Sequence, residues 1–330
     1  MVCVTKVHKG HDAVDEEEYK AELYKLLEIQ RETEIKLSKL ALSRVAPGKV
    51  DPYQFAVEVK EEQRKPNVKV TRQFTTDLTN IDTVISHSDD TVWIADRVNK
   101  TMKHSKLTKD NIQVISKVRT HVFDMSINTD NGVLLSVGGE WVKLLNEGPV
   151  RISNSNCNVA PLRTFGIHAT KDWKVITGAV THGSAFTGTG RRVVIVMDEK
   201  GNHEKIYEHD RDNKPLFTFP RRITGTSNGN ICVIDKLDTS HRGRVVFLGP
   251  AGNILHIYTG HPDINSNDSP FRPSGILTTS SDNIIVADFH NHTLHILNCN
   301  GVTITYIRTD YLGIMEPFSL CLSINQDISI

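Results

Sequence analysis

Three stretches of the sequence share one pattern: DDTVWIAD (residues 89–96), NGNICVID (228–235) and SDNIIVAD (281–288). Each begins with polar turn residues such as Asn, Asp or Gly, continues as an apolar run, and ends on an aspartate. A short apolar run bounded by turn residues is typical of a buried β-strand. The sequence therefore predicts the same buried strand three times.

The pattern occurs in five copies in all. Two weaker copies are NGVLLSVG and DWKVITG, and the last residues of the five copies are Asp96, Gly138, Gly178, Asp235 and Asp288, at spacings of 42, 40, 57 and 53 residues. Each copy is followed by a polar loop, a further strand, a turn and a fourth strand. Units of four short strands at this period predict the blades of a β-propeller, in which each sheet buries its faces against its neighbours.

A repeated proline sets the number of blades that we expect. Pro220 and Pro273 each lie fifteen residues before the aspartate of their unit, and Pro317 begins a sixth unit in the same phase. The sequence thus predicts an all-β, six-bladed propeller whose last blade is incomplete. We expect residues 67–74 to supply the outer strand of that blade, and the chain to be a clipped form of a longer one.

The N-terminal part of the chain has a helical pattern. No Gly or Pro interrupts residues 15–46, and a second short helix is predicted to begin at Asp51 and end before Pro66. A coiled-coil seam of 4-3 spacing is predicted at Leu23, Leu26, Leu37 and Leu40. This seam predicts self-association, docking to a partner helix, or one helix lying on its own domain. We expect a flexible N-terminus (1–14), a helical or coiled-coil segment (15–66) and a propeller (67–330).

The propeller resembles the NHL-repeat propellers found at the C-terminal end of tripartite-motif (TRIM) proteins. After VAD the fifth unit continues with Asn291, His292, Thr293 and Leu294, close to the motif that names the family. The helical segment occupies the place of the family's coiled coil. The chain departs from the family because it has no C-x-x-C pair from which RING and B-box zinc sites are built. The resemblance therefore implies a recognition part of a TRIM-like ubiquitin ligase system, without ligase activity of its own.

Composition limits where the protein acts. Basic and acidic residues balance at 39 each, so no net charge draws the chain to nucleic acid or to an acidic membrane. The sequence has no signal-peptide pattern and no apolar run long enough to span a bilayer. Its five cysteines are odd in number and widely spaced, which favours free thiols. We expect a cytoplasmic protein with no membrane partner.

The chemical motifs of catalysis are weak. None of the fifteen histidines forms a helical ligand pair with a carboxylate motif, so we expect no metal and no cofactor. The repeated aspartates recur at one place in each unit, where a carboxylate can accept backbone N–H bonds and close the loop to the next strand. We therefore interpret the repeated aspartates as structural residues and predict no catalytic residue.

Basic residues give the one candidate site. In a propeller, the loop that leads into an inner strand and the loop after the second strand open on the same rim. The rim residues that we expect to bind a partner are Arg97, Arg119, Trp141, Arg163, Arg221, Arg222, Arg242, Arg272, His290 and His292. The alternative is that these are scattered side chains on solvated loops.

The sequence favours a non-enzymatic interaction module that binds a protein partner through this rim. Two alternatives stay open: an RNA-binding propeller, and a propeller hydrolase or lyase.

Overall fold

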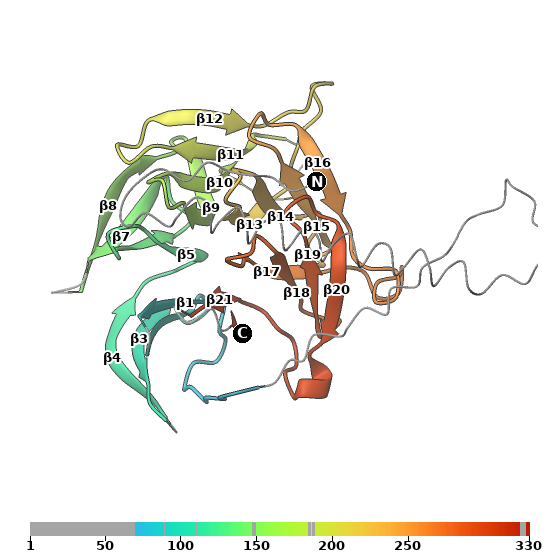
Figure 1. Ribbon diagram of the computed structural model, residues 1–330. Coiled ribbons are helices and arrows are strands. Elements are labelled where there is room, and N and C mark those ends of the chain that lie inside the picture. Colours follow the sequence, from blue (N-terminus) through green and yellow to red (C-terminus); the bar gives the residue numbers. More distant parts are fainter. Residues whose placement is uncertain are drawn as a thin grey trace, which may run out of the picture. The chain divides into compact units, whose positions relative to one another are not determined.

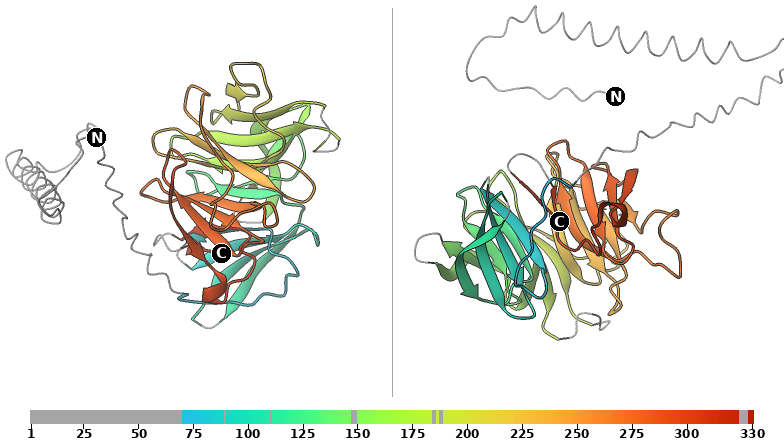
Figure 2. Two further views of the ribbon diagram at one scale, coloured as in Figure 1. Left: turned by 90° about the vertical axis from the view of Figure 1, so that its right-hand side faces the viewer. Right: turned by 90° about the horizontal axis from the view of Figure 1, so that it is seen from below.

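The computed structural model describes residues 70–88, 90–109, 111–146, 150–183, 186, 189–323 and 328–330. These residues form five four-stranded antiparallel sheets and one two-stranded sheet. The sheets stand around a common centre as the blades of a β-propeller (Figure 1). Figure 2 shows the same sheets from two further sides. The predicted all-β propeller fold is confirmed.

Within each blade the strands pair in chain order, and the first strand lies nearest the centre (Figure 1). Blade 1 contains β1 (Thr83–Ser88), β2 (Thr91–Asp96), β3 (Thr101–Leu107) and β4 (Ile112–Arg119). Blade 2 contains β5 (Asp124–Ile127), β6 (Val133–Ser136), β7 (Trp141–Asn146) and β8 (Arg151–Asn158). Blade 3 contains β9 (Leu162–Ala169), β10 (Val175–Thr181), β11 (Arg192–Met197) and β12 (His203–Tyr207). Blade 4 contains β13 (Pro220–Gly225), β14 (Ile231–Lys236), β15 (Gly243–Leu248) and β16 (Ile254–Tyr258). Blade 5 contains β17 (Pro273–Thr278), β18 (Ile284–Asp288), β19 (Thr293–Leu297) and β20 (Thr303–Arg308).

The hydrophobic core is divided into clusters that lie between neighbouring blades. One cluster joins Val193 and Ile195 of blade 3 to Val142 of blade 2. The next joins Val194 of blade 3 to Val246 of blade 4. Side chains that alternate along one strand thus enter two different clusters, because successive residues point to opposite faces of a sheet. This arrangement explains why β11, the third strand of blade 3, is apolar on both faces.

The two weaker copies end on glycine because there is no room for a side chain. A Cβ atom on Gly178 would lie 2.4 Å from the backbone oxygen of Pro220 in the next blade. Gly138 has φ +74°, and a Cβ atom there would lie 2.6 Å from the Phe123 ring. The Pro220 backbone of the next blade at Gly178, and the Phe123 ring together with the positive φ at Gly138, therefore leave no room for an aspartate.

The repeated aspartates accept backbone N–H groups, as the sequence predicts, but mostly from the loop that leads into the inner strand and not from the expected loop to the next strand. Asp96 accepts the backbone N–H groups of Thr79 and Asn80, and Asp235 accepts those of Thr218 and Phe219. Asp288 accepts the N–H of Arg272. Each carboxylate thus holds the loop that leads into the inner strand of its own blade.

The prediction of a sixth blade is wrong, because five blades are complete and the sixth position holds a short hairpin. This hairpin consists of β21 (Cys321–Leu322) and β22 (Ile328–Ser329). It connects the two ends of the ring, since Cys321 packs with Val84 of blade 1 and Leu320 packs with Leu277 of blade 5. The N–H of Val84 also donates to the Ser319 hydroxyl at 3.1 Å. A few residues therefore fill the interval between blades 5 and 1.

The expected outer strand at 67–74 is absent from its described part, because residues 70–74 contain no strand. An outer strand needs a third strand to pair with, and the described hairpin has only two strands. Residues 67–69 lie outside the described residues. The predicted helical segment over 15–66 and its seam residues also lie outside them.

One helical turn occurs in the described part of the chain, the 3₁₀ helix η1 (Asp310–Leu312). No helix among the described residues is long and apolar enough to cross a membrane.

Candidate functional site: the central channel and its mouth

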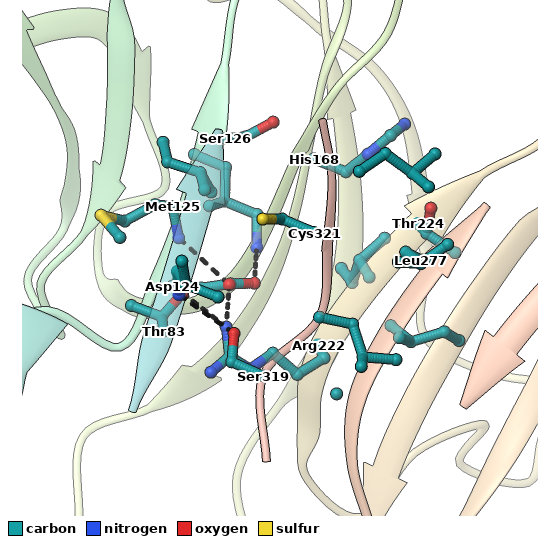
Figure 3. Close-up of a pocket in the computed structure, with 18 of the residues that line it drawn as sticks. Thr83, Asp124, Met125, Ser126, His168, Arg222, Thr224, Leu277, Ser319 and Cys321 are labelled. Carbon is teal, nitrogen blue, oxygen red and sulfur yellow. Dashed lines mark hydrogen bonds and ion pairs between the residues drawn. The ribbon is translucent and has the colours of Figure 1, made fainter. Parts of the chain in front are cut away.

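The inner strands surround a channel pocket of about 240 Å³. It is lined by β1, β5, β9, β13 and β17, together with residues 319–322 of the closing segment (Figure 3). We call the end at which the inner strands begin the mouth, and the opposite end the far end. Figure 3 shows the side chains of Asp124 and Arg222 together at one end of the pocket and His168 at the other.

A buried ion pair closes the pocket at the mouth. The Arg222 guanidinium contacts the Asp124 carboxylate and the backbone oxygen of Asp82, and it donates to the Thr83 hydroxyl at 3.1 Å. The second Asp124 oxygen accepts the N–H of Ile167 at 3.0 Å. Burial raises the pKa of the Asp124 carboxyl, and the nearby Arg222 charge acts in the opposite direction. One arginine of blade 4 thus binds the first residues of blades 1 and 2 across the channel.

Beyond this ion pair lies a group of cations that we call the basic mouth: Arg97, Arg221, Lys236 and Arg272. The guanidinium groups of Arg97 and Arg221 lie 5.4 and 5.2 Å from the centre of the Phe123 ring. The positive charges of Arg221 and Arg272 act on Lys236. These four residues come from three blades, so only the closed ring brings them together.

The chemistry of Lys236 differs from that of an ordinary lysine. It is the last residue of β14, it is 8% exposed, and its Nζ donates to the backbone oxygen of His241 at 3.1 Å. Burial and the charges of the surrounding arginines lower its pKa to about 7, and the Asp288 carboxylate opposes this change. Near neutral pH a large fraction of this side chain is therefore an uncharged amine.

Aromatic rings form an arc along one side of the mouth. Neighbouring ring centroids of Phe123, Phe165 and Phe219 lie 4.7 Å apart in edge-to-face contact. The arc continues at one end to His121 and at the other to Phe186. Its Phe123 ring lowers the polarity around Arg97 and Arg221 and limits the access of water to these two guanidinium groups.

The far end of the pocket is lined by neutral polar groups. His168 lies in the channel with Ser126, Thr224 and Thr278, and the hydroxyls of Thr224 and Thr278 are 2.8 Å apart. Burial lowers the pKa of His168 to about 4, so its ring is neutral at neutral pH.

The structure brings some of the predicted rim residues together and separates others. Arg97, Arg163, Arg221 and Arg272 lie around the mouth, where the Arg163 Nε donates to the Gly138 oxygen at 2.7 Å. His290 lies close enough to Arg272 for the arginine charge to lower the histidine pKa, after burial as the larger cause.

Arg222 was expected in a rim loop that binds a partner, but it lies in strand β13, is 5% exposed, and its guanidinium is paired with Asp124. Arg119 ends the outer strand β4, and Trp141 begins β7 opposite Asn158. Arg242 forms an exposed ion pair with Asp238. The His292 ring accepts the N–H of Glu316. The binding role of the rim stays a prediction.

Three residues of the site did not appear in the sequence-based site: Lys236, Asp124 and His168. A signal for Lys236 is present in the repeat, because the residue after each repeated aspartate is Arg97, Lys236 or Phe289. The aspartate holds the loop into the inner strand, so the next residue lies at the mouth. No comparable local signal marks Asp124 or His168.

Comparison with known proteins finds the fold but no family. No family model matches the chain, and no curated protein matches its sequence. Among solved structures, regucalcin, a calcium-binding protein from Agrobacterium tumefaciens, is similar at 12% identity over 75% of this chain and 79% of that one, with a TM-score of 0.52. A luciferin-regenerating enzyme is similar at 14% identity over 74% and 80%, with a TM-score of 0.53. A streptogramin B lyase is similar at 12% identity over 77% and 91%, with a TM-score of 0.51.

These comparisons correct two expectations. The chain was expected to be a non-enzymatic interaction module that serves a TRIM-like ligase system. The solved structures that it resembles include enzymes instead, and no family model supports an NHL repeat or a TRIM relationship. At these identities the likeness establishes the propeller fold, and this fold carries enzymes.

The channel does not suit a calcium ion. Calcium takes six to eight oxygen ligands, several of them carboxylates. Asp124 is the acidic residue among those that line the channel, and its oxygens already accept from Arg222 and from the N–H groups of Met125 and Ile167. Among the described residues, no group of three or more His, Cys, Asp or Glu side chains is placed to hold a metal ion.

Proposed function

We propose that this propeller is a lyase that removes a proton from a carbon atom beside a carbonyl group of a small substrate, with Lys236 as the general base. The observation that carries the proposal is the position of Lys236, which is buried at the channel mouth among Arg221, Arg222 and Arg272. Likeness to a streptogramin B lyase and a luciferin-regenerating enzyme supports the proposal only as far as the shared fold.

A general base works best when its pKa is close to the pH at which it acts. The Lys236 pKa of about 7 meets this condition, since burial and neighbouring arginines favour the neutral amine. Its Nζ donates one hydrogen bond to the His241 oxygen, which leaves the lone pair of the neutral amine available for a proton.

In the proposed step the amine of Lys236 takes the proton from the substrate carbon. The electron pair of the C–H bond forms a C=C bond, and the bond to the leaving group breaks with its own electron pair. Lys236 then holds the proton as an ammonium group and returns it to the leaving group or to solvent. Elimination of this kind needs a base and positive charge near the developing enolate oxygen. The basic mouth supplies both from the residues of this chain.

The test compares Lys236→Met with the matched control Lys205→Met. Lys205 also donates from Nζ to a backbone oxygen, that of Pro250 at 2.9 Å, but it is exposed on β12 of blade 3. Each protein is incubated with a panel of small carboxylic acids that carry a leaving group on the β-carbon, and the unsaturated product is followed by ultraviolet absorbance. Circular dichroism verifies that each variant is folded.

We expect the wild type and Lys205→Met to form product, and Lys236→Met to lose at least about a hundredfold in kcat/KM, the lower range for a general base. Activity of the wild type should fall as pH decreases through about 7, because the base becomes protonated. Absence of product with every member of the panel would overturn the proposal, as would a Lys236→Met variant with unchanged activity.

A further inference from the structure

Three cations of the basic mouth have no carboxylate partner. Arg97 pairs with Asp82 at 3.3 Å, but Arg221, Lys236 and Arg272 make no ion pair with any acidic side chain that the structure describes. Arg221 instead donates to the backbone oxygen of Phe123 at 2.9 Å. Buried or half-buried positive charge without a counterion is unfavourable.

The nearest acids are already engaged by other groups. Asp124 is paired with Arg222, and Asp82 accepts hydrogen bonds from the backbone N–H and the side-chain Nε of Arg97. Asp288 accepts the amides of Asn265 and Asn291 and the N–H of Arg272. These carboxylates act on Arg221 and Lys236 only from a distance.

Two further observations indicate that the missing partner is an anion from outside the protein. The Nε of Arg272 is buried and has no hydrogen-bond partner among the described residues. Loss of solvent around the Arg221 guanidinium, together with the Arg222 charge, lowers the pKa of Arg221 to about 9. The Arg272 Nε–H therefore has no acceptor among the described residues, and the positive charge of Arg221 is not neutralised by a paired carboxylate. Both arginines act on Lys236.

We infer that the mouth is an anion site, in which Arg221 and Arg272 hold a carboxylate or phosphate group of a small organic molecule beside Lys236. Guanidinium groups match the planar oxygens of such anions and bind them through charge-assisted hydrogen bonds. The Phe123 ring beside Arg221 strengthens this interaction because it limits the access of water to that guanidinium. As a substrate class the inference rests on the proposed lyase function, since the same mouth holds Lys236.

Anion binding and the titration of Lys236 must be coupled. The charged and titratable groups that face Lys236 are Arg221 and Arg222 from blade 4, Arg272 and Asp288 from blade 5, and His241 from the loop after β14. A bound anion adds negative charge and favours the ammonium form, so it raises the pKa of Lys236. By linkage, the anion binds more tightly as pH falls through about 7.

The experiment measures how fast acetic anhydride at trace level acylates Lys236, by mass spectrometry of the digested protein over a range of pH. The probes are benzoate for a carboxylate, inorganic phosphate for a phosphate, and benzyl alcohol as the uncharged control. The proteins are wild type, Arg221→Gln, Arg272→Gln and the control Arg151→Gln, whose side chain is exposed at the start of the outer strand β8.

We expect at least one anion to slow the acylation of Lys236 in the wild type and in Arg151→Gln, while benzyl alcohol has no effect. In Arg221→Gln and Arg272→Gln the concentration needed for protection should rise about tenfold to a hundredfold, as for loss of a charged hydrogen bond. Protection by benzoate alone identifies a carboxylate site, and protection by phosphate alone identifies a phosphate site. Arg272→Gln remains informative if Arg221→Gln does not fold, because the Arg272 Nε makes no described hydrogen bond.

The inference is overturned if neither anion protects Lys236, or if both arginine variants are protected as well as the wild type. This outcome is separate from the test of the lyase. Protection without product formation would refute the proposed reaction and keep the anion site, whereas product formation without protection would refute the anion site alone.

Discussion

Replacement of Arg222 by methionine would remove the guanidinium that pairs with Asp124 and keep most of the side-chain volume. The two side chains are 6% and 8% exposed. Asp124 would retain the N–H groups of Ile167 and Met125 as donors, at 3.0 and 3.1 Å. The Arg222 contacts with Thr83 and Asp82 would be lost as well.

The expected loss of stability is large because a carboxylate would remain buried without a counterion. Removal of one partner from a buried ion pair costs about 3–5 kcal/mol. For a domain of this size each kcal/mol lowers the melting temperature by about 2–4 °C, so a decrease of roughly 10 °C follows. An exposed pair contributes about 0–1 kcal/mol. Arg191→Met, which breaks the exposed pair with Glu208, is therefore the matched control.

The loss of stability in Arg222→Met should grow as pH rises. Without Arg222 the folded-state pKa of Asp124 rises further above its unfolded value, because the attraction that opposed the effect of burial is lost. A raised carboxyl pKa means that the folded state binds the proton more tightly than the unfolded state. The variant should therefore be closest to wild type near pH 4 and should lose stability relative to it as pH rises toward 7.

Urea unfolding followed by circular dichroism at pH 4.5 and pH 7.5 measures both effects. The double variant Arg222→Met with Asp124→Leu should recover most of the stability, because it removes the unpaired charge. If the free energy of unfolding of Arg222→Met at pH 7.5 is within about 1 kcal/mol of wild type, the ion pair does not connect the blades as described. A deficit of equal size at both pH values would mean that Asp124 is not left charged.

Two further predictions concern packing. Gly178→Ala should destabilise the propeller by about 1–3 kcal/mol in the same urea assay, since its Cβ would lie 2.4 Å from the Pro220 oxygen, whereas Gly139→Ala, with its nearest neighbour at 4.0 Å, should be close to neutral. Equal effects of the two substitutions would refute the close approach of blades 3 and 4. Among Cys157, Cys232, Cys299 and Cys321, iodoacetamide should modify Cys299 first, because the other three are buried and burial raises the pKa of the Cys157 and Cys232 thiols. Peptide mass spectrometry measures the order, and early modification of Cys232 would contradict its place in the core.

The repeat was readable from the sequence because its determinants are local. An apolar strand of the ICVID type, its turn and its terminal aspartate all lie within eight residues, and alternation and turn chemistry act over that range. The propeller fold, the position of the second strands and the role of Asp96, Asp235 and Asp288 as acceptors of backbone N–H bonds were therefore predicted correctly. The number of blades in the ring was not, because it depends on how the closing segment packs against both blade 1 and blade 5.

The channel mouth was decided by the tertiary structure. Arg222 reads as a loop arginine in the sequence, and its partner Asp124 lies 98 positions away along the chain. Lys236 reads as an ordinary lysine after a strand, and its lowered pKa comes from burial and from arginines that other strands and another blade bring to it. The sequence by itself determined the strands, their period and the residues that close their loops, since these follow from neighbours in the chain. Which charges become buried, which find partners and which remain unpaired depends on distances across the closed ring, and only the folded propeller sets those distances.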